Sequence, residues 1–181
     1  MSEQAPYLVE QILEGVEVRR YSPMVLATVH DMPDNEAFRI LFKYISGNNR
    51  SISRLDQAAS TAAGGEKIAM TVPVFSAGNS FSFVMPSSFS KESAPEPQDP
   101  RSIVEGMPER RVAALRFSGV AREGAVAART RQLLETLARH ELRPRGTPFL
   151  MRYNAPFTPG FMRRNEVAIE LVPAEQDRGR A

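Results

Sequence analysis

The sequence of 181 residues contains no cysteine and only two histidines, His30 and His140. Without cysteine there is no disulfide framework, no thiolate nucleophile and no cysteine-based metal site, and two histidines are too few for a histidine-rich metal site. No apolar run approaches the roughly 18 residues of a membrane-spanning helix. The first ten residues also lack the basic and apolar regions of a secretory signal. We therefore expect a cytoplasmic protein without a membrane span.

Lysine is scarce too, so the formal charge of +2 is carried mostly by arginine. Residues 1–90 have 7 basic and 9 acidic side chains, whereas residues 91–181 have 16 and 12. This is a weak basic bias without an aromatic-interleaved basic stripe, so the sequence does not predict nucleic-acid binding. It also contains no G-x-S-x-G elbow, no phosphate-binding loop and no H-E-x-x-H motif. We therefore expect a binding protein rather than an enzyme.

The order strand-strand-helix-strand-strand occurs twice. The first repeat spans about residues 7–86, a connection follows at 87–100, the second repeat spans about 101–172, and 173–181 form a tail. Two copies that each contain one amphipathic helix can bury their apolar faces only against each other. The prediction is one α+β domain, 1–181, with a pseudo-twofold repeat that forms a distorted β-barrel or curved antiparallel sheet flanked by two helices.

The first predicted helix begins after the cap signal Asp31-Met32-Pro33-Asp34 and runs to about Ser46. Its apolar stripe has the spacing i, i+3, i+4, i+7 and consists of Phe38, Leu41, Phe42 and Ile45. Arg39 and Lys43 share the neighbouring face, because they are four residues apart. The second predicted helix covers about Glu123 to His140.

A strand is predicted from Lys67 to about Ser76. Its first part, Lys67–Val74, has Ile68, Met70, Val72 and Val74 alternating with smaller or polar residues. Pro73 cannot donate a ladder hydrogen bond, so this strand should end at a sheet edge or a bend. The preceding residues 50–65 are small and polar and predict a surface loop.

Three stretches together resemble the SOUL haem-binding family: Val16–Pro23, Lys67–Val74, and Tyr153–Phe157 with Arg163–Val167. The resemblance covers nearly the whole chain, from about Tyr7 to Val172, in the family's order and spacing. It implies a distorted barrel with two helices and internal pseudo-symmetry. The fold is also similar to the effector-binding domains of some bacterial transcription regulators, which bind amphipathic small molecules.

The resemblance implies reversible binding of haem or a related tetrapyrrole on an apolar patch beside the first helix. The apolar surface would be Phe38, Leu41 and Phe42, and Arg39 and Lys43 would lie near the propionates. Such a surface suits a porphyrin, which is a flat apolar plate with two carboxylates. Periodicity alone favours a different explanation, in which the apolar side chains are core and the two cations are a solvated rim. An apolar helix stripe can also face a partner.

The sequence does not predict a clear axial ligand for the haem iron. At the position where some family members have a proposed axial histidine, this sequence has Arg20. His30 is the nearest substitute, and Met70 could also approach the iron. His140 is explained by its place near a helix C-terminus, where a cation is favourable. We therefore expect the protein to bind haem with weak axial coordination of the iron or with none.

The stretch Arg163-Arg164-Asn165-Glu166 adds three further candidates. The related effector-binding fold has a glutamate in this part that points into its ligand cleft, so the predicted site includes Arg163, Arg164 and Glu166. A buried glutamate there must pair, and arginine is the expected partner. The alternatives are an exposed ion pair, a module that binds another amphipathic small molecule instead of haem, and a hydrolase that uses Glu166 as general base.

Overall fold

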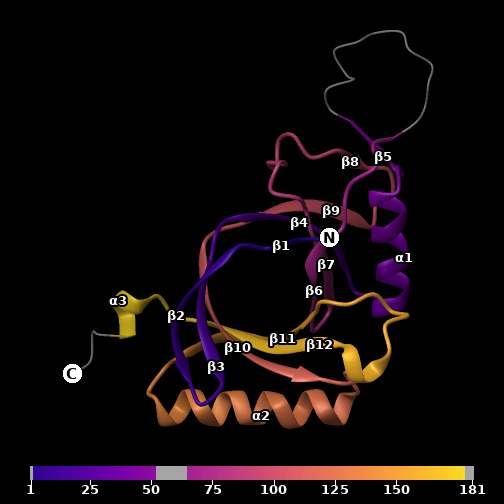
Figure 1. The fold of residues 1–181 in the computed structure, drawn as a ribbon. Helices are drawn as coiled ribbons and strands as arrows, with labels where there is room; N and C mark the ends of the chain where they lie inside the picture. The colour runs from indigo at the N-terminus through magenta and orange to yellow at the C-terminus, as the bar shows by residue number, and fades with distance from the viewer. Residues whose placement is uncertain (1, 52–64, 178–181) are drawn as a thin grey trace, which may run out of the picture. The chain divides into compact units, whose positions relative to one another are not determined.

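The computed structural model describes residues 2–51 and 65–177 (Figure 1). The chain forms two compact units, which we call the α1 unit and the α2 unit. The α1 unit contains the described residues up to Ala5 together with Pro23–Pro108, and the α2 unit contains Pro6–Ser22 and the chain from Glu109 onward. Most of the loop predicted at 50–65, and the last residues of the tail, lie outside the described residues.

The sheet of the α1 unit has the strand order β6-β7-β4-β9, and β1 pairs with β6 in parallel. The four main strands pair antiparallel, and β5 and β8 form a separate two-stranded sheet. The elements of this unit are β1 (Glu3–Gln4), β4 (Met24–His30), α1 (Asp34–Ile45), β5 (Asn49–Arg50), β6 (Thr71–Ala77), β7 (Ser80–Val84), β8 (Glu96–Pro97) and β9 (Ser102–Met107).

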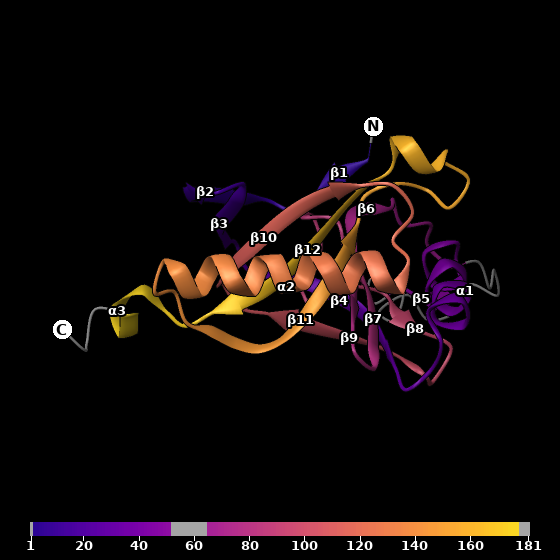
Figure 2. The ribbon, with the colours of Figure 1, turned by 90° about the horizontal axis from the view of Figure 1, so that it is seen from below.

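The α2 unit is an antiparallel sheet in the order β2-β3-β10-β12-β11. Helix α2 packs on β10, β12 and β11 and crosses these strands, as Figure 2 shows. The elements of this unit are β2 (Tyr7–Leu13), β3 (Val16–Tyr21), β10 (Arg110–Ser118), α2 (Glu123–Arg139), β11 (Pro144–Arg152), the 3-10 turn η2 (Gly160–Met162), β12 (Arg164–Leu171) and α3 (Ala174–Asp177).

The expected α+β class is confirmed, with antiparallel strands and one long helix in each unit. The units do not follow the sequence repeats, however. Strand β3 of the first repeat pairs with β10 of the second, from Arg110↔Tyr21 to Leu115↔Val16. Strand β9 pairs with β4, so it belongs to the α1 unit. Each unit therefore combines segments of both repeats, which periodicity alone could not indicate.

Helix α1 packs against β4 and β7 and buries one face. The buried residues of this face are Ala37, Ile40, Leu41, Tyr44 and Ile45. The hydroxyl of Tyr44 donates to the Pro95 carbonyl at 2.8 Å, so the polar end of this buried ring is satisfied. This packing fixes the helix with its opposite face outward.

Two local predictions were wrong. Asp31 does not cap α1: the N-cap is Pro33, with no side-chain cap hydrogen bond, and Asp31 has a φ of 58°. Strand β6 begins at Thr71 rather than at the predicted Lys67, because the backbone N–H of Ile68 donates to the Ile45 carbonyl at 2.8 Å. Pro73 does not mark the end of the strand, which continues to Ala77, but it falls in a register shift between Thr71 and Val74.

Candidate functional site

The outward face of α1 carries an aromatic ring that is half exposed. Phe42 is 50% exposed, and its ring stacks on Phe38 with centroids 5.8 Å apart and an interplanar angle of 15°. Phe38 meets Phe83 edge-on at 5.5 Å, and Phe83 lies in the core of the α1 unit. Phe42 is thus the outer end of an aromatic stack that begins inside the protein.

Arg39 and Lys43 lie beside this ring and are both exposed. The nearby carboxyl group of Asp99 has a lowered pKa, caused first by hydrogen bonds from Arg101 and more weakly by the charge of Lys43. Because Arg101 binds Asp99 at 2.7 Å, much of that negative charge is already balanced by Arg101. The positive charges of Arg39 and Lys43 beside Phe42 are therefore little reduced by Asp99.

Two further predicted site residues, Leu41 and Met70, belong to or pack against the core of the α1 unit. Leu41 is 0% exposed and lies in the core of the α1 unit, because its position on the helix points toward the sheet. Met70 is half-buried and packs against the same core. Leu41 is inaccessible to a ligand, so the exposed surface consists of Phe42 and the two cations, backed by Phe38.

The two histidines lie in different units, and neither is part of a cluster of metal-ligating side chains among the described residues. His30 is exposed at the end of β4, and His140 binds Glu14 through Nε2 at 2.9 Å. Arg20, at the position of the family's proposed axial histidine, binds Glu10 at 2.7 Å. Among residues 2–51 and 65–177, no group of three or more histidine or carboxylate side chains could hold a metal ion.

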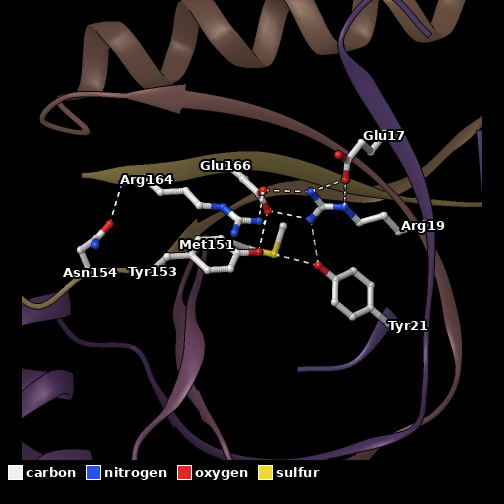
Figure 3. A network of polar contacts seen from close by, with 8 residues as sticks. All are labelled: Glu17, Arg19, Tyr21, Met151, Tyr153, Asn154, Arg164 and Glu166. Atoms are coloured by element: carbon white, nitrogen blue, oxygen red, sulfur yellow. Dashed lines mark hydrogen bonds and ion pairs between the residues drawn. The ribbon is translucent and has the colours of Figure 1, made fainter. Parts of the chain in front are cut away.

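The α2 unit contains a buried polar network centred on Glu166, which is 0% exposed (Figure 3). Both carboxylate oxygens accept two hydrogen bonds each. The donors are Arg19 Nη1 at 2.7 Å and Tyr153 OH at 2.6 Å to Oε2, and Arg19 Nη2 at 2.9 Å and Arg164 Nη2 at 2.8 Å to Oε1. The acceptor capacity of the carboxylate is therefore fully used.

The arginines of this network are held by aromatic rings as well as by charge. The guanidinium of Arg19 lies 4.3 Å from the centre of the Tyr7 ring and also binds Glu17 at 2.7 Å. The guanidinium of Arg164 lies 3.9 Å from the centre of the Tyr153 ring. These contacts fix the two cations in the planar geometry that a bidentate carboxylate needs.

Burial alone would raise the pKa of Glu166, but the hydrogen bonds and charge of Arg19, with Tyr153 and Arg164, outweigh it and lower the pKa to about 2. The carboxylate is thus ionised and already saturated with donors. A general base needs a free lone pair and a pKa nearer to neutral pH, so this geometry favours a structural role for Glu166. The expected pairing of a buried Glu166 with arginine is confirmed.

The predicted site residues therefore form two groups in different units. Phe38, Arg39, Phe42 and Lys43 lie together on α1, and Arg164 and Glu166 meet in the α2 unit. Arg163 does not join Glu166; its Nε donates to the Thr158 carbonyl at 2.7 Å.

Arg19 and Tyr153 were missed as partners of Glu166. The sequence does carry a signal for Arg19, since Glu17, Arg19 and Tyr21 share one face of β3 by strict alternation.

No helix in the described part of the chain is long and apolar enough to cross a membrane. No curated protein matches the sequence. Similar solved structures include the C-terminal domain of EcmrR, which is 10% identical with a TM-score of 0.53 and covers 91% of this chain and 97% of that one. They also include a hydrolase from Listeria innocua, which is 10% identical with a TM-score of 0.56 and covers 90% and 94%.

At such low identity these structures show a shared fold only. The sequence itself gives a more specific result, because the model of the SOUL heme-binding protein family matches residues 2–170. That match spans almost the whole chain and includes both the α1 surface and the Glu166 network. The chain belongs to the SOUL heme-binding protein family.

Proposed function

We propose that the protein binds haem or a related tetrapyrrole reversibly on the outward face of α1, as a carrier, buffer or sensor. The observation that carries this proposal is the half-exposed Phe42 ring, stacked on Phe38 and bordered by Arg39 and Lys43. An apolar plate with two carboxylates fits an exposed aromatic face with cations beside it. Membership of the SOUL family supports the same ligand class.

The proposed binding does not depend on a protein ligand to the iron. Phe42 would contact the porphyrin face, and Arg39 and Lys43 would bind the propionates. When bound, haem would supply redox and ligand-exchange chemistry at its iron, and no reaction is assigned to the chain's own residues. We therefore expect metal-free protoporphyrin IX, which retains the plate and the propionates, to bind about as well as haemin.

The test is a titration of the full chain with haemin, followed by absorbance in the Soret region. We expect saturable binding in the wild type, and about tenfold or greater weakening in Phe42→Asp and in the double variant Arg39→Glu/Lys43→Glu, because each removes one half of the recognition. His30→Ala should bind like the wild type. Loss of binding in His30→Ala alone would make that residue an axial ligand and contradict this mode of binding.

Matched controls separate the site from general effects of charge. Ile103 is 43% exposed on β9 of the same unit, so Ile103→Asp introduces the same charge at a comparable apolar position. Arg50→Glu/Lys91→Glu changes the net charge by the same amount at two other exposed positions. Both controls should bind haemin like the wild type. Non-saturating adsorption of haemin by the wild type would overturn the proposal.

The second candidate function is a module that binds another amphipathic anion at the same surface. It is favoured by one observation, that Arg20 is engaged with Glu10 where an axial histidine is expected. A suitable probe is 1-anilinonaphthalene-8-sulfonate, an aromatic anion without iron. Suppose that the wild type binds this probe, that Phe42→Asp does not, and that haemin binding fails to saturate. The protein is then better described as a module that binds another amphipathic anion.

A further inference from the structure

An apolar patch lies in the α2 unit and includes none of the residues proposed above to bind haem. Three side chains of the connection between β11 and β12, residues 153–163, are strongly exposed: Phe157 at 89%, Phe161 at 82% and Met162 at 63%. Val120, which follows β10, is 47% exposed. A Cβ at Gly160 would lie 2.9 Å from Val120 Cγ2, so the connection packs directly against Val120. We call these four residues, three on the connection and one on the strand end that it packs against, the loop patch.

The connection has a defined internal structure that holds these side chains outward. Arg163 Nε donates to the Thr158 carbonyl at 2.7 Å, and its guanidinium also binds the Pro156 carbonyl. The backbone of Met162 donates to the Pro159 carbonyl at 2.9 Å. Figure 2 shows this segment, in yellow-orange, projecting beyond the end of the strands that it joins. Apolar side chains in such a braced turn are displayed to a partner rather than folded back onto the protein.

The charge around the loop patch is mainly positive. Residues 152–165, which contain the connection and its two ends, include three arginines and no aspartate or glutamate. Arg163 donates to two uncharged carbonyl oxygens, which leave its positive charge uncancelled. Arg122 is exposed two residues after Val120, and Glu123 is the nearest exposed acid along the chain there. The following acid, Glu166, is buried and already neutralised by Arg19 and Arg164.

We propose that the loop patch docks on the surface of an anionic lipid bilayer. The phenylalanine and methionine side chains would enter the boundary between headgroups and acyl chains, and the arginines would meet the anionic headgroups. Aromatic and apolar side chains combined with cations are the features of interfacial membrane binding, and each cation near an anionic surface strengthens the attraction. The proposal is independent of the α1 surface and concerns attachment to one leaflet, without any spanning segment.

The sequence offers a clean reporter, because it contains no tryptophan. We would prepare the full chain with Phe157→Trp and mix it with vesicles of phosphatidylcholine containing about one third phosphatidylglycerol. The expected result is a blue shift of the emission and quenching by brominated acyl chains, both reduced by high salt because the electrostatic part is screened. Ile12→Trp is the control, since Ile12 is 65% exposed on β2 of the same unit and should show neither change.

A second measurement uses sedimentation with the same vesicles. Phe157→Asp/Phe161→Asp should lower the bound fraction about tenfold or more, with unchanged thermal unfolding because both side chains are more than four-fifths exposed. Vesicles of phosphatidylcholine alone should retain much less wild-type protein. The proposal is overturned if the wild type stays in solution with anionic vesicles, or if the double variant sediments equally well. It is also overturned if the loop patch instead joins two copies of the chain, seen as a dimer that the double variant dissociates without any vesicle binding.

Discussion

The two units use cations in opposite ways. On α1, Arg39 and Lys43 face solvent beside a half-exposed ring, whereas in the α2 unit Arg19 is buried and satisfied by Glu166 and aromatic neighbours. A buried cation that already has its partners stabilises the fold and has little left to offer a ligand. An exposed cation contributes little to stability and remains available. The comparison therefore supports our proposal that α1 carries recognition, and it favours a structural role for the Glu166 network.

The sharpest way to break this comparison is to remove the charge at the centre of the network. Glu166→Gln leaves the Arg19 guanidinium buried without a counter-charge, so we expect the free energy of unfolding to fall by about 3–5 kcal/mol. Urea denaturation followed by circular dichroism measures it. Glu170→Gln is the control: it lies on the same strand and is 3.8 Å from Arg145, so it should cost about 0–1 kcal/mol. Equal losses in the two variants would remove the structural role from Glu166.

Within α1, adjacent residues should separate stability from binding. Leu41→Ala removes a fully buried side chain and should cost about 2–5 kcal/mol of stability, whereas haemin binding by the folded fraction should change little. Phe42→Ala should cost about 1 kcal/mol or less, because the ring is half exposed, yet weaken haemin binding. Both quantities can be measured on the same preparations. The reverse pattern would place Phe42 in the core and refute the α1 site.

The network should also make stability depend on acid. The pKa of Glu166 is lowered to about 2 in the folded protein, so between about pH 4.5 and 2 the unfolded state binds a proton that the folded state does not. The contribution of Glu166 to the free energy of unfolding is therefore fully present above about pH 4.5. It is lost as the pH falls toward 2, and the total loss is about 3 kcal/mol. The measurement is the difference in unfolding free energy between wild type and Glu166→Gln across this range. A difference that does not change with pH would contradict the assignment.

A smaller loss than that of Glu166→Gln is expected from the removal of one hydroxyl in the same network. Tyr153→Phe removes the 2.6 Å hydrogen bond to Glu166 but keeps the ring beneath Arg164, so it should cost about 1.5–3 kcal/mol. Thermal unfolding checks this value. Tyr153→Leu removes the ring as well and should cost more. If the two variants are equally stable, the cation–π contact with Arg164 contributes nothing measurable.

Much of this architecture could be predicted from residue patterns. Helix α2 was predicted to begin at about Glu123 and does begin there, because its apolar residues repeat with a clear period. The start of β6 was not predicted correctly. The alternation of apolar residues continues through Lys67–Met70, but the backbone N–H of Ile68 in this stretch donates to Ile45 at the end of α1. Tertiary contacts, which no local pattern contains, decided that boundary.

The candidate site was harder to predict than the fold. The spacing of Phe38, Leu41 and Phe42 shows that they share a helix face, but it does not show that Leu41 is covered and Phe42 is not. No sequence pattern distinguishes Arg163 from Arg164. Only the turn before β12 directs Arg163 to backbone carbonyls and Arg164 to Glu166. Arg19 and Glu166 are 147 residues apart, so their contact is a property of the sheet order.

The exchange of segments between the two repeats has a consequence for how the chain folds. The α2 unit cannot be completed until β12, near the end of the chain, has been synthesised, since its sheet places β10 between β3 and β12. Contacts of such long sequence separation slow folding, because a large loop must close before they form. While the ribosome is still adding the second half, the hairpin of β2 and β3 has neither its partner strand nor a counter-charge from Glu166 for Arg19. The nascent chain thus presents an unpaired strand edge for most of its synthesis, which is the condition under which chaperones act.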